Sequence, residues 1–333
     1  MVGDTTTIWI MAADRPEARS PIAKIHHQTG YGVRANIAPD ARRLAYTVLP
    51  VDVGTAIERA NLWVMNLDGT SPKLVQEGVD LQSAPVWSSD GRKLVFRRSV
   101  EAQAGQRRTE LWQVEMASGE AKRLVADEEA MGLYPIGWAK EGKKLYYSRI
   151  TSAGSALWEA DEVTAKPSLV LPLSDGIARD LRLSPDGLAL SYSHGQPSGS
   201  EVQYRVEVVN LAAKTREVMA TGRNDHLAPL WRPKGMTLTL SSEPGEVMGQ
   251  GAVVELGLEA RATTVPFAAP ANGFDVPLQW SPQGDYLAVK TFQRGSTQAV
   301  QSETMAILST SDGRRIPVSL SGYAEFIGWV MSQ

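Results

Sequence analysis

One short pattern recurs along the whole chain and constrains the fold more than any other feature. Over 84–96 it reads Ala-Pro-Val-Trp-Ser-Ser-Asp-Gly-Arg-Lys-Leu-Val-Phe, an apolar run that enters an Asp-Gly turn and leaves it as an alternating run. Related copies return about every 50 residues, a period typical of repeated β-sheet units rather than of helical repeats. We call the last residue of each apolar run its anchor. The seven anchors are Ile37, Trp87, Trp138, Leu183, Trp231, Trp280 and Trp329.

Each repeat predicts four strands. The Pro-Asp-Gly or Asp-Gly turn joins the first two strands, because proline presets φ and glycine accepts positive φ. Third strands are predicted around Leu62–Met65, Leu111–Val114, Leu157–Ala160, Val206–Val208, Val253–Leu256 and Met305–Leu308, and fourth strands around Leu74, Leu124, Leu169, Val218, Thr264 and Ile316. Four antiparallel strands per repeat make one blade of a β-propeller. We therefore predict an all-β chain with a single propeller domain over 1–333.

The two ends of the chain supply different parts of one further repeat. Residues 7–14 match a third strand and residues 21–25 a fourth strand, whereas Phe326-Ile327-Gly328-Trp329 matches a first strand. Joining the ends would close the ring and remove open sheet edges. This predicts seven blades, the last shared by the N- and C-termini, with residues 7–14 and 324–331 in the same blade.

The nine tryptophans occupy two fixed positions of the repeat. Five of them (Trp87, Trp138, Trp231, Trp280 and Trp329) are first-strand anchors, and the other four (Trp9, Trp63, Trp112 and Trp158) share one third-strand position. Aromatic residues at fixed repeat positions are expected to pack between stacked sheets rather than to form a platform for nucleic-acid bases.

The repeat resembles that of the TolB-like and WD40-like β-propellers. The resemblance rests on turns such as Trp280-Ser281-Pro282-Gln283-Gly284 and on the run Leu-Trp-Val-Met-Asn-Leu-Asp-Gly over 62–69, and it spans nearly the whole chain. The chain also resembles the propeller domains of prolyl-oligopeptidase-type peptidases. The resemblance implies an extracytoplasmic location, periplasmic or secreted, and transfers no functional residue.

Composition excludes several classes of function. The chain has no cysteine, which removes disulfides, thiolate nucleophiles and cysteine-ligated metals. A net charge of -3 argues against nucleic-acid binding. No apolar run is long enough to span a membrane, and the first residues lack the pattern of a signal peptide.

Motifs for catalysis are also missing from the sequence. There is no Gly-x-Ser-x-Gly nucleophile motif and no glycine-rich phosphate loop. The repeated Asp-Gly pairs lack calcium-loop spacing and are read as turns. We therefore expect no catalytic residue, no cofactor and no metal. The sequence favours a protein that is not an enzyme over one that is.

The histidines form the one constellation that could contradict this expectation. His26, His27, His194 and His226 are all predicted on the propeller face that carries the connections between second and third strands. Imidazole groups suit zinc or manganese. A lyase or hydrolase with a metal site at these histidines is therefore one alternative.

Long connections between second and third strands are predicted on the same face, over 48–60, 98–110, 193–203, 241–251 and 290–302. Recognition usually resides in such loops. Arg97, Arg98, Arg107 and Arg108 in the second loop, together with His226, are the candidate binding residues. The favoured function is a non-catalytic, monomeric scaffold that binds a protein or peptide through this long-loop face and the central channel. The other alternative is a detached gating domain of a prolyl-oligopeptidase-like serine peptidase.

Overall fold

The computed structural model describes residues 3–101, 107–222, 227–242, 250–259, 261–294, 300–320 and 322–330. Within these residues the chain divides into two compact units. Unit 1 comprises 1–10, 20–175 and 330–333, and unit 2 comprises 11–19 and 176–329. The prediction of one domain over 1–333 stays a prediction, and each unit is described by itself.

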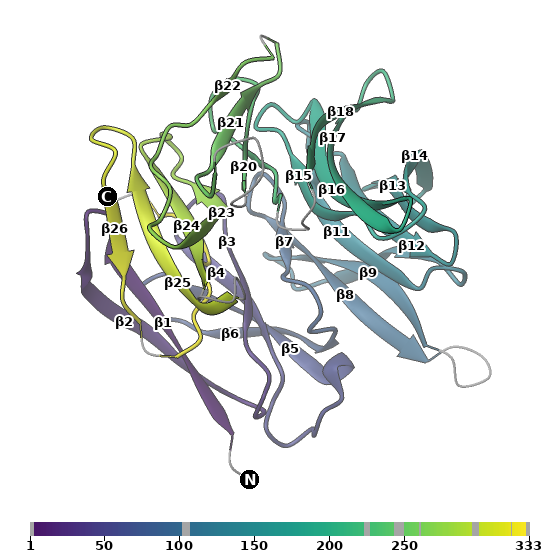
Figure 1. Cartoon of the computed structure of the whole chain (residues 1–333). Coiled ribbons are helices and arrows are strands. Elements are labelled where there is room, and N and C mark those ends of the chain that lie inside the picture. Colours follow the sequence, from purple (N-terminus) through teal and green to yellow (C-terminus); the bar gives the residue numbers. More distant parts are fainter. Residues whose placement is uncertain are drawn as a thin grey trace. The chain divides into compact units, whose positions relative to one another are not determined.

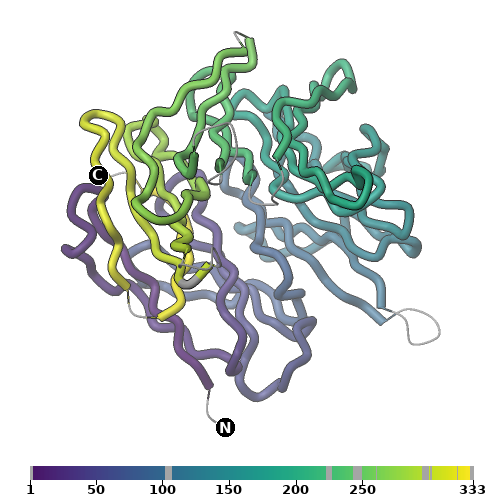
Figure 2. Tube along the Cα trace, in the orientation of Figure 1, coloured from purple at the N-terminus to yellow at the C-terminus, as the bar shows by residue number. Residues whose placement is uncertain are grey.

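Unit 1 contains three four-stranded antiparallel sheets, each made from one contiguous stretch of chain (Figures 1 and 2). The first is β3 (Arg34–Ile37), β4 (Arg43–Val48), β5 (Ala60–Asn66) and β6 (Lys73–Val79); the second is β7 (Val86–Trp87), β8 (Lys93–Glu101), β9 (Arg107–Glu115) and β10 (Ala121–Ala126); the third is β11 (Gly132–Trp138), β12 (Lys144–Thr151), β13 (Gly154–Asp161) and β14 (Pro167–Ser174). One short 3-10 helix, η1 (Ile57–Arg59), precedes β5.

Unit 2 repeats the same arrangement three times. Its sheets are β15 (Arg179–Leu183), β16 (Ala189–Ser198), β17 (Glu201–Asn210) and β18 (Thr215–Gly222); β19 (Leu230–Trp231), β20 (Thr237–Leu240), β21 (Val254–Gly257) and β22 (Thr263–Thr264); and β23 (Gly273–Trp280), β24 (Tyr286–Arg294), β25 (Val300–Ser309) and β26 (Arg315–Val318). Consecutive strands are neighbours in every sheet, so the predicted blades and their first-to-fourth strand order are confirmed.

The N-terminal strands β1 (Asp4–Ala12) and β2 (Arg15–His27) form a two-stranded sheet, as the third- and fourth-strand patterns there predict. The C-terminal part of the prediction is wrong in one respect. Residues 322–330 contain no strand, so the first strand expected at Phe326–Trp329 does not form. Trp329 nevertheless packs on Tyr286, with ring centroids 6.2 Å apart.

The first-strand tryptophans are buried because they lie between adjacent sheets. Trp87, Trp138, Trp231 and Trp280 are 4–8% exposed, which confirms the packing role predicted for them. Two of the third-strand tryptophans, Trp112 and Trp9, are more exposed than these first-strand tryptophans. Trp112 is half-buried, and Trp9 on β1 is 39% exposed.

Three of the first-strand tryptophans make the same hydrogen bond. The indole N–H donates to the backbone carbonyl of the residue that precedes the anchor of the preceding blade. The pairs are Trp87 with Asn36 at 3.1 Å, Trp231 with Arg182 at 3.0 Å, and Trp329 with Gln279 at 3.1 Å. Trp329 therefore occupies an anchor position even though no strand surrounds it.

The turns between first and second strands are built as the Ser-x-Asp-Gly pattern predicts. The Ser88 hydroxyl donates to Asp90 at 2.6 Å and accepts from the Lys93 backbone N–H at 2.9 Å. Gly91 has a φ of 67°, in the left-handed region that favours glycine. The repeated aspartates therefore serve these turns, as expected for hairpin chemistry.

Candidate functional site

The predicted binding loop over 98–110 is mostly a pair of strands. β8 and β9 stay paired from Lys93↔Glu115 to Glu101↔Arg107, and only 102–106 fall outside the described residues. The loop prediction failed because antiparallel pairing uses backbone groups, which polar residues supply as well as apolar ones. The connection predicted over 193–203 is wrong for the same reason, since β16 and β17 pair to Ser198↔Glu201.

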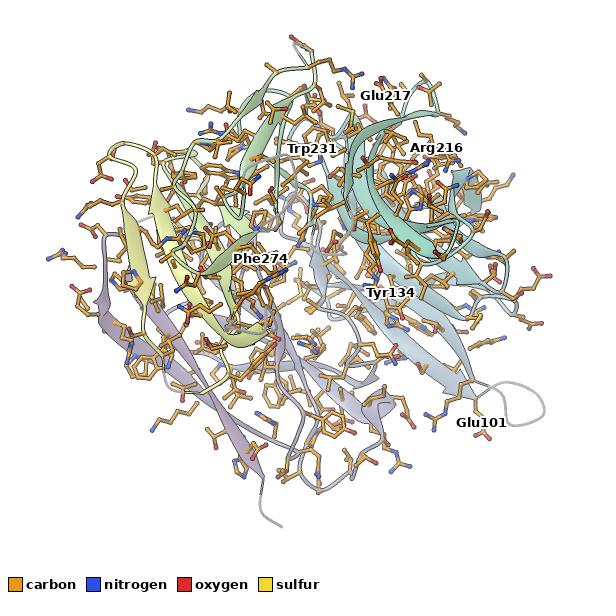
Figure 3. All side chains as sticks on the ribbon, in the orientation of Figure 1. Glu101, Tyr134, Arg216, Glu217, Trp231 and Phe274 are labelled. Atoms are coloured by element: carbon orange, nitrogen blue, oxygen red, sulfur yellow. The ribbon has the colours of Figure 1, made fainter. Side chains whose placement is uncertain are left out.

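Arg97 is buried inside this strand pair rather than presented to solvent. Its side chain is 2% exposed and lies 3.7 Å from the Asp80 carboxylate, which is 1% exposed. The guanidinium also donates to Gln82 Oε1 at 3.1 Å and lies 4.2 Å from the ring centroid of Tyr134, labelled in Figure 3. Asp80 and Gln82 follow β6, whereas Tyr134 lies on β11, so Arg97 on β8 connects two other segments of unit 1.

The other three arginines also have partners in unit 1. Arg98 lies 4.7 Å from the Trp112 ring centroid and donates to Gln76 at 2.9 Å. Arg107 pairs with Glu58 at 2.6 Å, and Arg108 pairs with Glu110 and with Glu128, both at 3.1 Å. Recognition of an acidic ligand by these arginines stays a prediction, and a ligand would have to compete with these carboxylates.

The histidines have separate partners. On β2, His26 Nδ1 lies 3.1 Å from the Thr5 hydroxyl, and the buried His27 lies 2.8 Å from the Thr6 hydroxyl through Nε2. His194 lies on β16 and is described below, and His226 lies outside the described residues. In the described part of the chain, no group of three or more His, Cys, Asp or Glu side chains could hold a metal ion.

A buried polar cluster that the sequence did not predict surrounds Glu207 in unit 2. The Tyr192 hydroxyl donates to Glu207 Oε2, and His194 Nε2 lies 3.2 Å from Glu207 Oε1. Arg216, labelled in Figure 3, lies 3.7 Å from the same carboxylate. Burial raises the pKa of Tyr192. The cluster lies inside one blade, with the Glu207 carboxylate buried and the Arg216 side chain 47% exposed.

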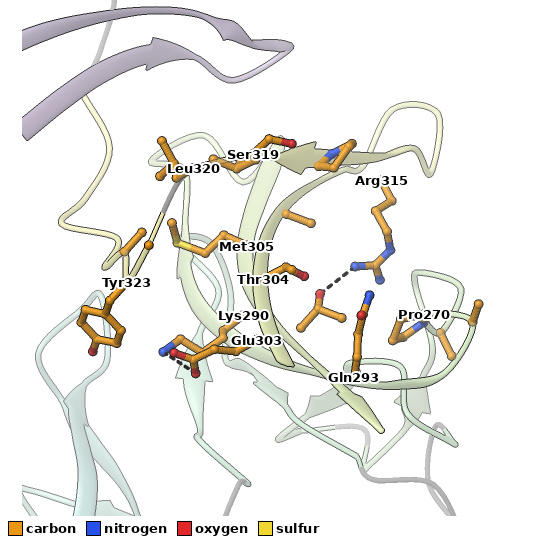
Figure 4. A pocket seen from close by; sticks show the side chains of 18 residues that line it. Pro270, Lys290, Gln293, Glu303, Thr304, Met305, Arg315, Ser319, Leu320 and Tyr323 are labelled. Atoms are coloured by element: carbon orange, nitrogen blue, oxygen red, sulfur yellow. Dashed lines mark hydrogen bonds and ion pairs between the residues drawn. The ribbon is translucent and has the colours of Figure 1, made fainter. Parts of the chain in front are cut away.

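Unit 2 also contains an open cavity of about 790 Å³ at the last four-stranded sheet (Figure 4). Its walls are formed by β24, β25, β26, the loop before β23 and the segment after β26. The lining residues are Ala269, Pro270, Ala271, Lys290, Thr291, Gln293, Glu303, Thr304, Met305, Ala306, Arg315, Pro317, Val318, Ser319, Leu320, Gly322, Tyr323 and Ala324. Most of them are apolar or small.

The strand register divides this lining into two sides, because residues directly opposite each other share a face of the sheet. Thr291 is opposite Thr304, and Ala306 is opposite Pro317, so they lie on what we call the Ala306 side. Lys290 is opposite Met305, which defines the Met305 side. Figure 4 shows Arg315, Gln293 and Pro270 together, apart from Lys290, Met305 and Tyr323.

The charged side chains of the cavity are already paired. On the Ala306 side, Arg315 forms a double ion pair with Asp275, which is fully buried, and donates to Thr291 at 3.1 Å. On the Met305 side, Lys290 lies 3.2 Å from Glu303 and 5.6 Å from the ring centroid of Tyr323. The lining therefore offers apolar surface, hydrogen-bonding groups and neutralised charge, and the described lining residues include no histidine or cysteine.

No protein-family model matches this chain, and no curated protein matches it. Solved structures do match. TolB from Acinetobacter baumannii is 16% identical, with a TM-score of 0.52, and the match covers 74% of this chain and 56% of that one. The fold is that of a TolB-like β-propeller.

Two other solved structures are similar at the level of the fold. A prolyl endopeptidase is 16% identical with a TM-score of 0.61, and the match covers 87% of this chain but 43% of that one. Oligogalacturonate lyase from Vibrio parahaemolyticus is 13% identical with a TM-score of 0.60, covering 85% of this chain and 79% of that one. This chain thus spans about half the length of the TolB and endopeptidase chains.

No helix among the described residues is long and apolar enough to cross a membrane.

Proposed function

We propose that this chain is a non-catalytic propeller that binds a protein or peptide partner, and that the cavity of the last four-stranded sheet is where it does so. The observation that supports this proposal is the lining of the cavity. Apolar side chains dominate it, and its cations are neutralised by Asp275 and Glu303. Such a surface suits burial of partner side chains with few fixed polar contacts.

The long-loop face is a weaker candidate for partner binding. Two of the predicted loops on that face, 98–110 and 193–203, are largely paired strands. Arg107 and Arg108 form ion pairs with Glu58 and Glu110 of their own unit. The cavity instead carries an exposed aromatic group at its rim, since Tyr323 is 73% exposed. Exposed aromatic side chains are frequent energetic anchors of interfaces.

Selection from a phage-displayed peptide library on the immobilised chain tests the proposal. Enriched peptides, resynthesised and measured by isothermal titration, should bind the unmodified chain and lose about tenfold or more in affinity to Tyr323→Ser. Val163→Ser is the matched control, because Val163 is 83% exposed on a turn of unit 1. Affinity for the control variant should be unchanged.

Two results would overturn the proposal. One is the absence of any enriched peptide with saturable binding. The other is enrichment of peptides that bind Tyr323→Ser and the unmodified chain equally well.

The alternatives from the sequence remain separate proposals. A gating domain would act only with a peptidase domain on the same protein, and a metal-dependent lyase would need histidines that converge. The proposal also includes an extracytoplasmic location, which the fold similarity to TolB supports, and a monomeric state.

A further inference from the structure

The residue at one position of the third strand differs between the four-stranded sheets of unit 1 and those of unit 2. In unit 1 this position holds tryptophan, opposite an aromatic residue of the second strand: Trp63 opposite Tyr46, Trp112 opposite Phe96, and Trp158 opposite Tyr147. In unit 2 the same position holds Glu207 opposite Tyr192, Val254 opposite Leu240, and Ala306 opposite Val289. We call it the third-strand position. Within each unit, Trp112, Trp158, Val254 and Ala306 pack in clusters that join one sheet to the preceding one.

Replacing an indole by a methyl group leaves unfilled space unless neighbouring groups move in. At Ala306 the replacement is only partial. Phe267, from the loop before β23, packs with Trp280 and Ala306 in one buried cluster. Farther out, the Ala306 side of the cavity remains open between Pro270, Pro317 and Arg315. The chain therefore has a hollow near a position where three of its other sheets carry a large aromatic ring.

We propose that the Ala306 side of the cavity binds an aromatic side chain, tryptophan or tyrosine, of the peptide or protein partner. This inference rests on the proposed function and names the chemical group that the cavity accepts.

The walls of this hollow suit the faces of an aromatic ring. A guanidinium over an indole recurs in this chain, with Arg149 5.4 Å from the Trp158 centroid, Arg98 4.7 Å from Trp112 and Arg232 4.5 Å from Trp280. Arg315 is held in place by Asp275 and Thr291 and is still 29% exposed, so its planar group can cover an incoming ring without being reordered. Thr304 and Gln293 supply polar groups for an indole N–H or a phenol hydroxyl.

The probe for this site is N-acetyl-tryptophanamide, with N-acetyl-leucinamide as the aliphatic comparison. The chain is labelled with ¹³C at its alanine methyl groups, and the spectrum is titrated with each compound. We expect the Ala306 methyl signal to shift saturably with the aromatic amide and with an apparent affinity at least about tenfold weaker for the aliphatic amide.

Ala306→Trp should fill the hollow from within. Because the open side accommodates the ring, this variant should keep a melting temperature close to that of the unmodified chain and lose the binding of the aromatic amide. Ala288→Trp is the matched control, since Ala288 is 2% exposed on the neighbouring strand and does not line this cavity. Overpacking at Ala288 should lower the melting temperature clearly.

The outcomes separate this inference from the proposed function. If the Ala306 signal does not respond to the aromatic amide, or responds equally to the aliphatic one, the aromatic assignment is overturned, whether or not Ala306→Trp folds. If selected peptides still depend on Tyr323 in that case, the binding function stands without an aromatic anchor. If neither probe nor peptide binds, both proposals fail.

Discussion

The two units are built from the same four-stranded repeat, yet they fill the space between sheets differently. Unit 1 places tryptophan at the third-strand position in all three of its four-stranded sheets, with a guanidinium over two of the rings. Unit 2 places Glu207, Val254 and Ala306 there. Unit 2 has a polar network around the buried Glu207 and an open cavity beside Ala306. In sheets that lack tryptophan at the third-strand position, the space can hold a polar network or a cavity instead.

The largest expected effect tests what the two units share. The first-strand tryptophans Trp87 and Trp231 are 6% and 5% exposed, and each donates to a carbonyl of the preceding blade. Trp87→Ala and Trp231→Ala should each lower the free energy of unfolding by about 3–5 kcal/mol. Chemical denaturation of both variants measures this. A loss in only one unit would show that the units do not share this packing.

The next effect tests what the units do not share. Trp112→Ala should cost roughly 2–3 kcal/mol, because the half-buried ring loses contacts with Arg98 and with the core of unit 1. At the corresponding position of unit 2, Ala306→Gly removes one methyl group and should cost about 1 kcal/mol. Equal losses in urea denaturation would contradict the comparison of the two units.

A third test uses pH, because Arg149 covers Trp158 and also pairs with Asp127 at 2.6 Å. Burial raises the pKa of Asp127, but hydrogen bonds from Arg149 and from backbone N–H groups outweigh it, so the pKa is lowered overall. A carboxyl with a lowered pKa in the folded state stabilises it above the unfolded-state pKa of about 3.9. That contribution is lost as the pH falls through the folded-state pKa.

Asp127→Asn should therefore lower the free energy of unfolding at pH 7 by about 1–2 kcal/mol. The difference from the unmodified chain should shrink as the pH falls below about 4. Thermal unfolding between pH 7 and pH 2.5 measures both. Asp52→Asn, on an exposed turn of the same unit, is the control. A difference for Asp127→Asn that persists at pH 2.5 would refute the ion-pair explanation.

The smallest expected effect again concerns a shared feature. Arg43 lies 4.9 Å from the Trp87 centroid and donates to Gly91, while Arg232 lies 4.5 Å from the Trp280 centroid and donates to Gly284. Lysine cannot reproduce a planar group that stacks and donates at once. Arg43→Lys and Arg232→Lys should each cost about 0.5–1 kcal/mol. Melting temperatures that do not change in either variant would show that these contacts are incidental.

The repeat made the strands predictable, because turns and alternating apolar residues act locally. All the predicted third and fourth strands in the four-stranded sheets appear. The errors lie where polar residues stay in strands. Residues 193–198 looked like loop because they are rich in Gly, Ser and Gln, but their backbone pairs with β17. The missing strand at Phe326–Trp329 is a different error, since its anchor contact is kept without the strand.

The candidate site was less predictable, for two reasons. The partners of Arg97 lie on segments far apart in the chain, so no local pattern separates a buried ion pair from an exposed binding group. The cavity depends on what is absent from a repeat position. Aligning the third strands would have shown alanine at 306 where other repeats have tryptophan, and that signal was available in the sequence.

The hydrogen bonds of the first-strand tryptophans also bear on how such a chain can change over evolutionary time. The indole N–H groups of Trp87, Trp231 and Trp329 donate to main-chain oxygens, which every amino acid carries, and the acceptor residues are Asn36, Arg182 and Gln279. Trp280 differs, because it donates to the side-chain hydroxyl of Thr239. A blade can therefore exchange the side chain at its acceptor residue without breaking this link to its neighbour. Duplicated blades held by such links are free to diverge independently, which is one physical route to a shared fold at an identity of 16%.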